Sequence, residues 1–319
     1  GRKGYRALWQ QVLKVSVADL KRNYEKLDVS FDLWMGESDV DDMIPPMVEK
    51  MKNDGFAHIS EGALVVDIAE ETDKKELPPC IVLKSDGAAN YETTDLATIK
   101  YREDNFDPDA ILYVVDKRQE LHFIQVFRTA RKCGIAKQDT SLEFIGFGTM
   151  NGPGGKPFKT RDGGVLRLEY LLKEIEDKMF VKISENKDLP EDEARNTAKI
   201  TALAALKYGD LSNQASKDYI FDTERFTASE GDTGPYLLYT MVRIRSILAK
   251  YKEQGGEIGQ GDLIACAEAC GAGKSVLLDV AGFSKMVEEA FAERAPHKVC
   301  AFVYKLANDL YAVNSSAFA

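Results

Sequence analysis

The sequence lacks the features that mark several specialised classes of protein. Its 319 residues contain no apolar run near the roughly 18 residues that a membrane-spanning helix needs, so no membrane partner is expected. Ten prolines and 24 glycines are ordinary frequencies, which excludes collagen-like and low-complexity chains. The net charge of −10 argues against indiscriminate binding of DNA or RNA, although it does not exclude a local basic patch. The length and the 44% of hydrophobic residues indicate a folded chain of about two domains.

Cysteine and histidine are also scarce. The five cysteines, an odd number, form no C-x-x-C pair, which is typical of free thiols in a reducing compartment such as the cytoplasm. Cys266 and Cys270 lie one helical turn apart, but none of the three histidines has metal-ligand spacing from them. The sequence therefore predicts a cytoplasmic location and no metal site.

The pattern of residues 1–78 predicts a small α+β segment that connects parts of a larger domain or is inserted into it. The apolar spacing predicts, in chain order, a long helix over 5–27, a strand over 29–34, a helix over 41–53, and a hairpin of 56–59 with 63–68. Pro45 and Pro46 are expected to interrupt the second helix, because proline removes a backbone donor.

Residues 79–180 alternate between strand and helix patterns. The strands are expected over 80–84, 110–116 and 141–149, and the helices over 94–105 and 119–133, with Gly134 as the C-terminal cap of the last helix. The run 110–116 is continuously apolar, as in a strand buried on both faces. This alternation indicates a parallel, doubly wound α/β sheet, in which ligands bind beyond the carboxyl ends of the strands. Functional residues are therefore expected just after Lys84, Asp116 and Thr149.

The remainder of the chain reads as helical almost throughout. Helices are expected over 165–178, 191–207, 236–252, 261–270, 284–294 and 299–313, with Pro190 at the first position of the second of them. We therefore place a domain boundary near residue 180, with an all-α bundle over residues 181–319.

One short motif imitates a phosphate-binding loop. The string Gly271-Ala-Gly-Lys-Ser275 ends like a P-loop, but Glu268 occupies the position of the first required glycine and the preceding segment is helical rather than a strand. A turn between two helices is the better interpretation. The serine-hydrolase motif G-x-S-x-G does not occur.

A glycine-rich loop over 151–164 follows the last expected strand. It carries Lys156, Lys159, Thr160 and Arg161 among five glycines. Mobile backbone with cations can close over a polyphosphate and offset the charge that develops in nucleotidyl transfer. The residue types alone are equally compatible with a solvated surface hairpin.

A second candidate site joins the end of one strand to the start of a helix. Tyr91 and Asp95 are four residues apart, so within a helix they would share one face. A carboxylate there could bind a guanidinium in a two-pronged manner. The alternative is that Thr94 or Asp95 merely caps the helix.

Several longer motifs, each different from the others, are spread along the whole chain. In order, they are Phe31-Asp-Leu-Trp-Met-Gly-Glu37-Ser38, Tyr91-Glu-Thr-Thr-Asp95, Tyr113-Val-Val-Asp116, Gln119-Glu-Leu-His122-Phe123, Glu143-Phe-Ile-Gly-Phe-Gly148, Lys156-Pro-Phe-Lys-Thr-Arg161, Gly231-Asp-Thr-Gly-Pro-Tyr-Leu-Leu-Tyr239 and Arg243-Ile-Arg245. Together they resemble arginyl-tRNA synthetase across about residues 1 to 319. Several long motifs in register are far more specific than any single short one.

The resemblance implies a Rossmann-like nucleotide-binding domain, represented by its second half, followed by a helical anticodon-binding domain. It implies ATP-dependent activation of L-arginine and transfer to tRNA(Arg), with ATP as a substrate accompanied by Mg²⁺ and no tightly bound cofactor. The matching positions are Tyr91, Asp95 and Gln119 for arginine, His122, Met150 and Lys156 for ATP, Lys159, Thr160 and Arg161 for catalysis, and Tyr236, Tyr239 and Arg243 for tRNA. Stacking of unpaired bases on aromatic rings is a general route to recognition of single-stranded RNA.

The chain departs from the family pattern in three places. It contains no H-I-G-H or H-V-G-H string, it lacks the second lysine of the K-M-S-K-S signature, and it ends before the last helices expected in the bundle. These departures imply an internal fragment of the enzyme. Two alternatives to a ligase follow, namely a catalytically inactive tRNA-binding module and a nonfunctional remnant with exposed apolar edges.

Overall fold

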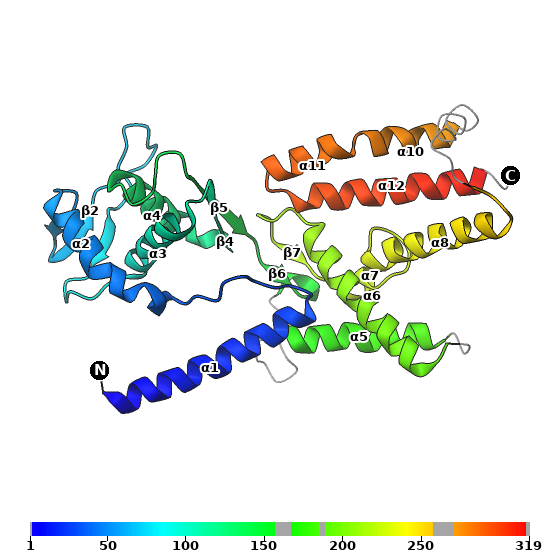
Figure 1. The fold of residues 1–319 in the computed structure, drawn as a ribbon, viewed down its shortest axis with the longest axis horizontal. Helices are drawn as coiled ribbons and strands as arrows, with labels where there is room; N and C mark the ends of the chain where they lie inside the picture. Colours follow the sequence, from blue (N-terminus) through cyan, green and yellow to red (C-terminus); the bar gives the residue numbers. More distant parts are fainter. Residues whose placement is uncertain (1, 157–166, 186–188, 258–270, 317–319) are drawn as a thin grey trace. The chain divides into compact units, whose positions relative to one another are not determined.

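The chain folds into two compact units. The computed structural model describes residues 2–156, 167–185, 189–257 and 271–316 (Figure 1). One unit comprises residues 31–148, and the other comprises residues 1–30 with 149–319. The domain boundaries expected near residues 78 and 180 rest on changes in sequence pattern, and they stay a prediction.

The unit of residues 31–148 begins with helices and an antiparallel sheet. Its first elements are the 3-10 helix η1 (Glu37–Met43), the helix α2 (Ile44–Asn53) and the strands β1 (His58–Ser60), β2 (Ala63–Val66) and β3 (Cys80–Leu83), paired antiparallel in the order β1-β2-β3. The predicted hairpin is confirmed, and its two-residue turn places Glu61 and Gly62 at φ values of 49° and 81°, as such turns require. The strand expected over 29–34 is wrong, because these residues have no strand pairing.

Pro45 and Pro46 start α2 rather than interrupt a helix. Both lie in its first turn, where a backbone N–H has no partner within the helix and its loss costs little. The expected interruption is therefore wrong. The preceding residues form η1 instead of continuing the α-helix.

The same unit contains a parallel β-α-β element. Its parts are α3 (Tyr91–Phe106), β4 (Ala110–Asp116), the 3-10 helix η2 (Lys117–Gln119), α4 (Glu120–Lys132) and β5 (Ser141–Phe147). β4 and β5 pair in parallel along seven residues, with Ala110 opposite Ser141, which confirms a parallel sheet with helices. Gly134, at φ 64°, follows the C-cap Cys133 of α4, as predicted. The expectation that β3 belongs to this parallel sheet is wrong, since β3 pairs antiparallel with β2.

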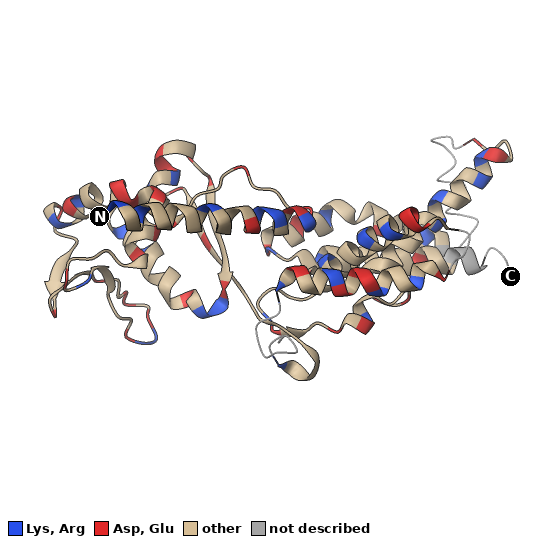
Figure 2. Ribbon diagram, turned by 90° about the horizontal axis from the view of Figure 1, so that it is seen from below, with Lys and Arg blue, Asp and Glu red and all other residues tan. Residues whose placement is uncertain are grey.

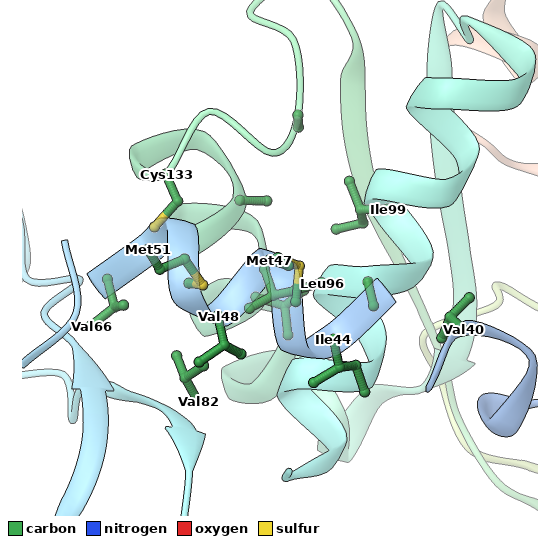
Figure 3. Packing of buried hydrophobic residues seen from close by; sticks show 14 of the residues in the cluster. Val40, Ile44, Met47, Val48, Met51, Val66, Val82, Leu96, Ile99 and Cys133 are labelled. Atoms are coloured by element: carbon green, nitrogen blue, oxygen red, sulfur yellow. The ribbon is translucent and has the colours of Figure 1, made fainter. Parts of the chain in front are cut away.

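The core of this unit lies between α2, α3, α4 and the strands. Figure 3 shows Met47, Val48 and Met51 of α2 packed close to Leu96 of α3 and Val82 of β3. β4 is buried on one face only: Ile111 and Tyr113 belong to the core, whereas Leu112 and Val114 are 41% and 63% exposed. The expectation of a strand buried on both faces is therefore wrong for these described residues.

The second unit is largely helical. It contains α1 (Lys3–Lys26), β6 (Met150–Asn151), the 3-10 helix η3 (Pro153–Gly155), α5 (Leu168–Ser184), α6 (Glu191–Leu211), β7 (Tyr219–Ile220), α7 (Thr223–Phe226), α8 (Gly234–Glu253), α10 (Gly271–Ala281), α11 (Phe283–Ala292) and α12 (Pro296–Ser316). Most of the helices expected here are confirmed, although Pro190 is the N-cap of α6 rather than its first residue. The turn expected over Gly271–Ser275 is wrong, because these residues open α10. The helix expected over 261–270 lies outside the described residues.

The helices of this unit pack in two groups, α5 with α6 and α10 with α11 and α12. Leu171, Leu172 and Ile175 of α5 form one apolar cluster with alanines of α6, whose small side chains let the two helices approach closely. Farther along the chain, α10 and α11 lie beside α12 (Figure 1). The N-terminus of α8 packs against the middle of α6.

The first helix, α1, carries more basic than acidic residues. Figure 2 shows basic residues spaced along α1, which has six Lys or Arg against two acidic residues, Asp19 and Glu25, both toward its C-terminal end. An overall acidic chain thus carries a locally basic helix. None of the described helices is both long enough and apolar enough to cross a membrane.

Candidate functional site

The N-terminus of α3 is fixed directly beyond the end of β3. The Thr93 hydroxyl, fully buried, donates to the Val82 carbonyl of β3 and also lies 3.4 Å from the Asn90 N–H. Asn90 is the N-cap, so Tyr91 is the first residue of the helix. The alternative that Thr94 or Asp95 caps the helix is therefore wrong.

Tyr91 and Asp95 meet a third side chain from α4. The Asp95 Oδ2 atom lies 2.6 Å from Nε2 of His122, and the Tyr91 ring lies over the imidazole at a centroid distance of 4.6 Å. His122 is 8% exposed, whereas Tyr91 is 56% exposed. Tyr91 and Asp95, two of the three residues assigned to arginine binding, both contact His122, so the helix face expected from their spacing is present. His122, assigned above to ATP, lies among the residues assigned to arginine.

A second carboxylate lies on the other side of the imidazole. Oε1 of Glu92, a residue 5% exposed, lies 3.8 Å from Nδ1 of His122. Burial by itself would lower the pKa of His122, but the Asp95 and Glu92 carboxylates outweigh it and raise that pKa to about 9. Burial would likewise raise the pKa of Glu92, and the adjacent imidazole reverses this so that its pKa is lowered. At neutral pH the group is therefore two carboxylates around one imidazolium, with a net charge of −1.

Gln119 lies at the carboxyl end of a parallel strand. It is the last residue of η2, immediately after β4, and it is exposed. The turn is held by Asp116, which accepts from Nε and Nη2 of Arg118 at 2.9 and 2.7 Å; these bonds hold the pKa of Asp116 at about 2. Gln119 therefore occupies the edge of the sheet where ligands are expected.

Apart from His122, the residues assigned to ATP and to catalysis fall in the unit of residues 1–30 and 149–319 or outside the described residues. Met150 is half-buried in β6, opposite Tyr219, and packs against the apolar cluster of α5 and α6. Lys156 is exposed, and its carbonyl accepts from the Gly152 N–H at 2.7 Å. Lys159, Thr160 and Arg161 lie outside the described residues, so their roles stay predictions.

The residues assigned to tRNA lie on α8. The Tyr236 hydroxyl donates to Asn308 of α12 at 3.0 Å, which ties this half-buried ring to the bundle. Tyr239 is 55% exposed one turn farther along. The Arg243 guanidinium lies 4.9 Å from the ring centroid of Tyr311. Of the two tyrosines, Tyr239 is the one more open to an incoming base.

Comparison with known families matches almost the whole chain. The model of "tRNA synthetases class I (R), catalytic domain" matches residues 1–223, which is more than half of the chain. The chain belongs to this class I tRNA synthetase family. The "DALR anticodon binding domain" model matches residues 237–313, so the family's catalytic domain is followed by an anticodon-binding domain.

Individual members of the family are similar along nearly the same length. The arginine–tRNA ligase of Agathobacter rectalis is 60% identical over 315 residues, covering 97% of this chain and 53% of that protein. The arginine–tRNA ligase of Alkaliphilus oremlandii is 52% identical, covering 97% and 52%. The chain thus spans about half the length of the curated relatives that it matches.

Solved structures of this synthetase family have the same fold. The arginyl-tRNA synthetase of Plasmodium falciparum superposes with a TM-score of 0.82 at 20% identity, over 99% of this chain and 53% of that one. That of Thermus thermophilus gives 0.78 at 22%, over 96% and 56%. The predicted fold class, a parallel α/β sheet followed by a helical domain, is confirmed.

Sequence reasoning missed one residue of the site in this synthetase chain. Glu92 lies at helical spacing from Leu96, Ile99 and Glu103, and all four are buried on one face of α3. That spacing was the available signal that Glu92 points inward. Within the described part of the chain, no group of His, Cys, Asp or Glu is suited to hold a metal ion. Cys266 and Cys270 lie outside it.

Proposed function

We propose that the chain acts as part of an arginine–tRNA ligase, which activates L-arginine with ATP to arginyl-adenylate and transfers it to tRNA(Arg). The observation that carries this proposal is the continuous similarity to arginine–tRNA ligases across both the catalytic and the anticodon-binding domain. Both steps are displacements that depend on positioning and on electrostatic stabilisation.

Arginine binds, in this proposal, against the exposed side of the Tyr91, Asp95 and His122 group. The Asp95 carboxylate accepts from the guanidinium, and the exposed Tyr91 ring offers a face for stacking. The net charge of −1 on Glu92, Asp95 and His122 complements one guanidinium. Gln119, at the end of β4, supplies an amide to the same substrate.

ATP binds through the remaining assigned positions. The glycine-rich loop carries Lys156, Lys159, Thr160 and Arg161, which offset charge on the phosphates together with Mg²⁺. The resemblance also assigns Met150 and His122 to ATP. Class I synthetases of this family use ATP as a substrate, so ATP enters this proposal as a substrate and not as a tightly bound cofactor. The free thiols of Cys80, Cys133 and Cys300 fit the cytoplasm as the place of action.

The helical domain reads the anticodon loop in this proposal. Tyr239 and Tyr236 stack on unpaired bases, and Arg243 contacts phosphate or a base. The support is the match to an anticodon-binding domain over α8 to α12.

Two assays of the purified chain test the proposal. Arginine-dependent exchange of pyrophosphate into ATP reports adenylate formation, and fluorescence anisotropy with tRNA(Arg) and a non-cognate tRNA reports recognition. We expect selective binding of tRNA(Arg) that survives moderate salt. Equal binding of both tRNAs that vanishes with salt would leave only nonspecific phosphate attraction and would contradict tRNA recognition.

Replacing Tyr236 and Tyr239 by Ala is expected to weaken tRNA(Arg) binding by about 1–3 kcal/mol for each stack that is lost. Tyr170→Ala is the matched control for Tyr239, because Tyr170 of α5 is equally exposed at 55% but, unlike Tyr239, lies outside the anticodon-binding match. Anisotropy titrations of the three proteins provide the measurement. Unchanged affinity in the double variant would mean that the tyrosines serve packing alone.

A further inference from the structure

Glu92 is a charged residue that the proposed reaction does not use, although it is buried beside the proposed arginine pocket. It is 5% exposed, and its Oε2 atom has no hydrogen-bond partner among the described residues. Burying a carboxylate in this way is costly unless an opposite charge compensates it. The opposite charge that pairs with it is the imidazolium of His122, whose Nδ1 lies 3.8 Å from Oε1 of Glu92.

The imidazole stands between two carboxylates, one at each ring nitrogen. Asp95 occupies the Nε2 side at 2.6 Å, and Glu92 faces the Nδ1 side. The imidazolium form donates from Nε2 to Asp95, and its positive charge is attracted by Glu92, which lies at ion-pair distance from Nδ1 and makes no hydrogen bond with it. The elevated pKa of His122, about 9, agrees with this geometry.

Three titratable neighbours of this cluster, Cys80, Tyr91 and Tyr113, are neutral at neutral pH, because the pKa of each is raised. Burial raises the pKa of the Cys80 thiol of β3 to about 12 and also raises the pKa of the Tyr113 phenol of β4. The neighbouring Glu92 carboxylate raises the pKa of Tyr91. Arg102 of α3 is a cation near this cluster: its guanidinium lies 5.1 Å from the centroid of the Tyr113 ring, on which the Asp95 charge also acts. The charge in direct contact with the imidazole comes from Asp95 and Glu92, and Glu92→Gln changes it while Arg102 stays in place.

Glu92 determines the net charge that the proposed pocket presents to the substrate. With Glu92 present, a protonated His122 and an ionised Asp95 leave a net charge of −1, which suits a guanidinium. Without Glu92, the same protonated His122 would cancel Asp95, and the pocket would present no net charge to a cationic substrate. The charge of the buried Glu92 thus offsets that of the His122 imidazolium, so the Asp95 charge is not cancelled.

We propose that Glu92 is a positioning residue for arginine binding: its buried carboxylate balances the His122 imidazolium, so that Asp95 keeps its negative charge available for the substrate guanidinium. The inference rests on the proposed function, because it takes Asp95 to contact arginine. Glu92 itself acts through His122 and does not touch the substrate.

The first part of the test is a titration of His122 in the 319-residue chain by NMR of labelled histidine rings. The chain has three histidines, so a His122→Gln spectrum assigns the resonance. We expect the Glu92→Gln variant to lower the pKa of His122 by one unit or more, on the order of a tenfold change in proton affinity. Glu103→Gln is the control, since Glu103 is a second buried glutamate of the same helix that pairs with Lys137 instead. An unchanged His122 titration in Glu92→Gln would overturn the proposal.

The second part is the arginine affinity of the same proteins at about pH 6.5 and about pH 8.5, by isothermal titration calorimetry. Wild type and Glu103→Gln keep His122 charged over this interval and are expected to show little change. In Glu92→Gln the imidazolium loses its proton as the pH rises, so the pocket gains negative charge and arginine affinity rises on the order of tenfold. A merely structural role of Glu92 would lower affinity equally at both pH values, which would also overturn the proposal.

Different results would contradict the proposed function and the role of Glu92. A wild-type chain that binds no arginine at either pH would contradict the proposed function, whatever the titration of His122 shows. A wild type that binds arginine, together with a Glu92→Gln variant that follows the wild-type pH profile, would overturn the role of Glu92 alone.

Discussion

Asp95→Ala is expected to lower arginine affinity by at least 100-fold, a cost of about 3 kcal/mol or more. The substitution removes the carboxylate that faces the guanidinium, and it leaves His122 with Glu92 as its remaining acidic partner. The local charge then stays near zero while His122 is protonated. Isothermal titration calorimetry of arginine binding to the wild-type and Asp95→Ala proteins measures the two affinities.

Asp104→Ala serves as the matched control for Asp95→Ala. Asp104 lies on the same helix and pairs with Lys100 at 2.9 Å on the exposed surface, so its loss is expected to change arginine affinity by less than about twofold. Circular dichroism checks that both variants keep their helical content. A folded Asp95→Ala protein with wild-type arginine affinity would remove Asp95 from the pocket.

Local periodicity of apolar residues predicted the long helices. α1, α3, α4, α6, α8 and α12 all appear within a few residues of their expected limits, because a long apolar stripe at helical spacing has few competing interpretations. The parallel pairing of β4 and β5 followed from the helix between them.

Pairing partners and short elements were less accessible from the sequence. The sequence of Cys80–Leu83 predicts a strand but not the sheet to which it belongs. Its antiparallel pairing with β2 depends on the tertiary fold, which places the hairpin beside it. Residues 29–34 alternate in polarity without a neighbouring strand to pair with, so the pattern alone did not produce a strand. Strand formation depends on distant partners in a way that helix formation does not.

The candidate site was predicted in part. The i, i+4 spacing of Tyr91 and Asp95 correctly indicated a shared helix face, because helical geometry alone determines it. The contact with His122, which comes from a different helix, required the tertiary fold. Glu92 escaped notice since a charged residue is usually assigned to solvent, and its buried position was detectable only from its spacing to Leu96 and Ile99.

Gly234→Ala is expected to destabilise the helical unit by about 3 kcal/mol. A Cβ atom at this position would lie 2.2 Å from the Ala204 carbonyl oxygen and 2.4 Å from its carbon. These are backbone atoms in the middle of α6, so α8 would have to move as a whole. For a unit of this size, the midpoint of thermal unfolding should fall by roughly 6 to 12 °C.

Circular dichroism during heating measures this change, and Gly4→Ala is the control. Gly4 lies in the first turn of α1, in the same unit, and a Cβ there meets nothing within 4 Å, so no loss of stability is expected. Because Thr233 accepts the Tyr236 N–H at 3.2 Å directly beside Gly234, a shifted α8 would also move the tyrosines proposed to stack on tRNA. The variant should therefore lose tRNA affinity together with stability. A Gly234→Ala protein that melts like wild type would show that α8 does not need this close approach to α6, and the glycine would then have to be explained by the tRNA instead.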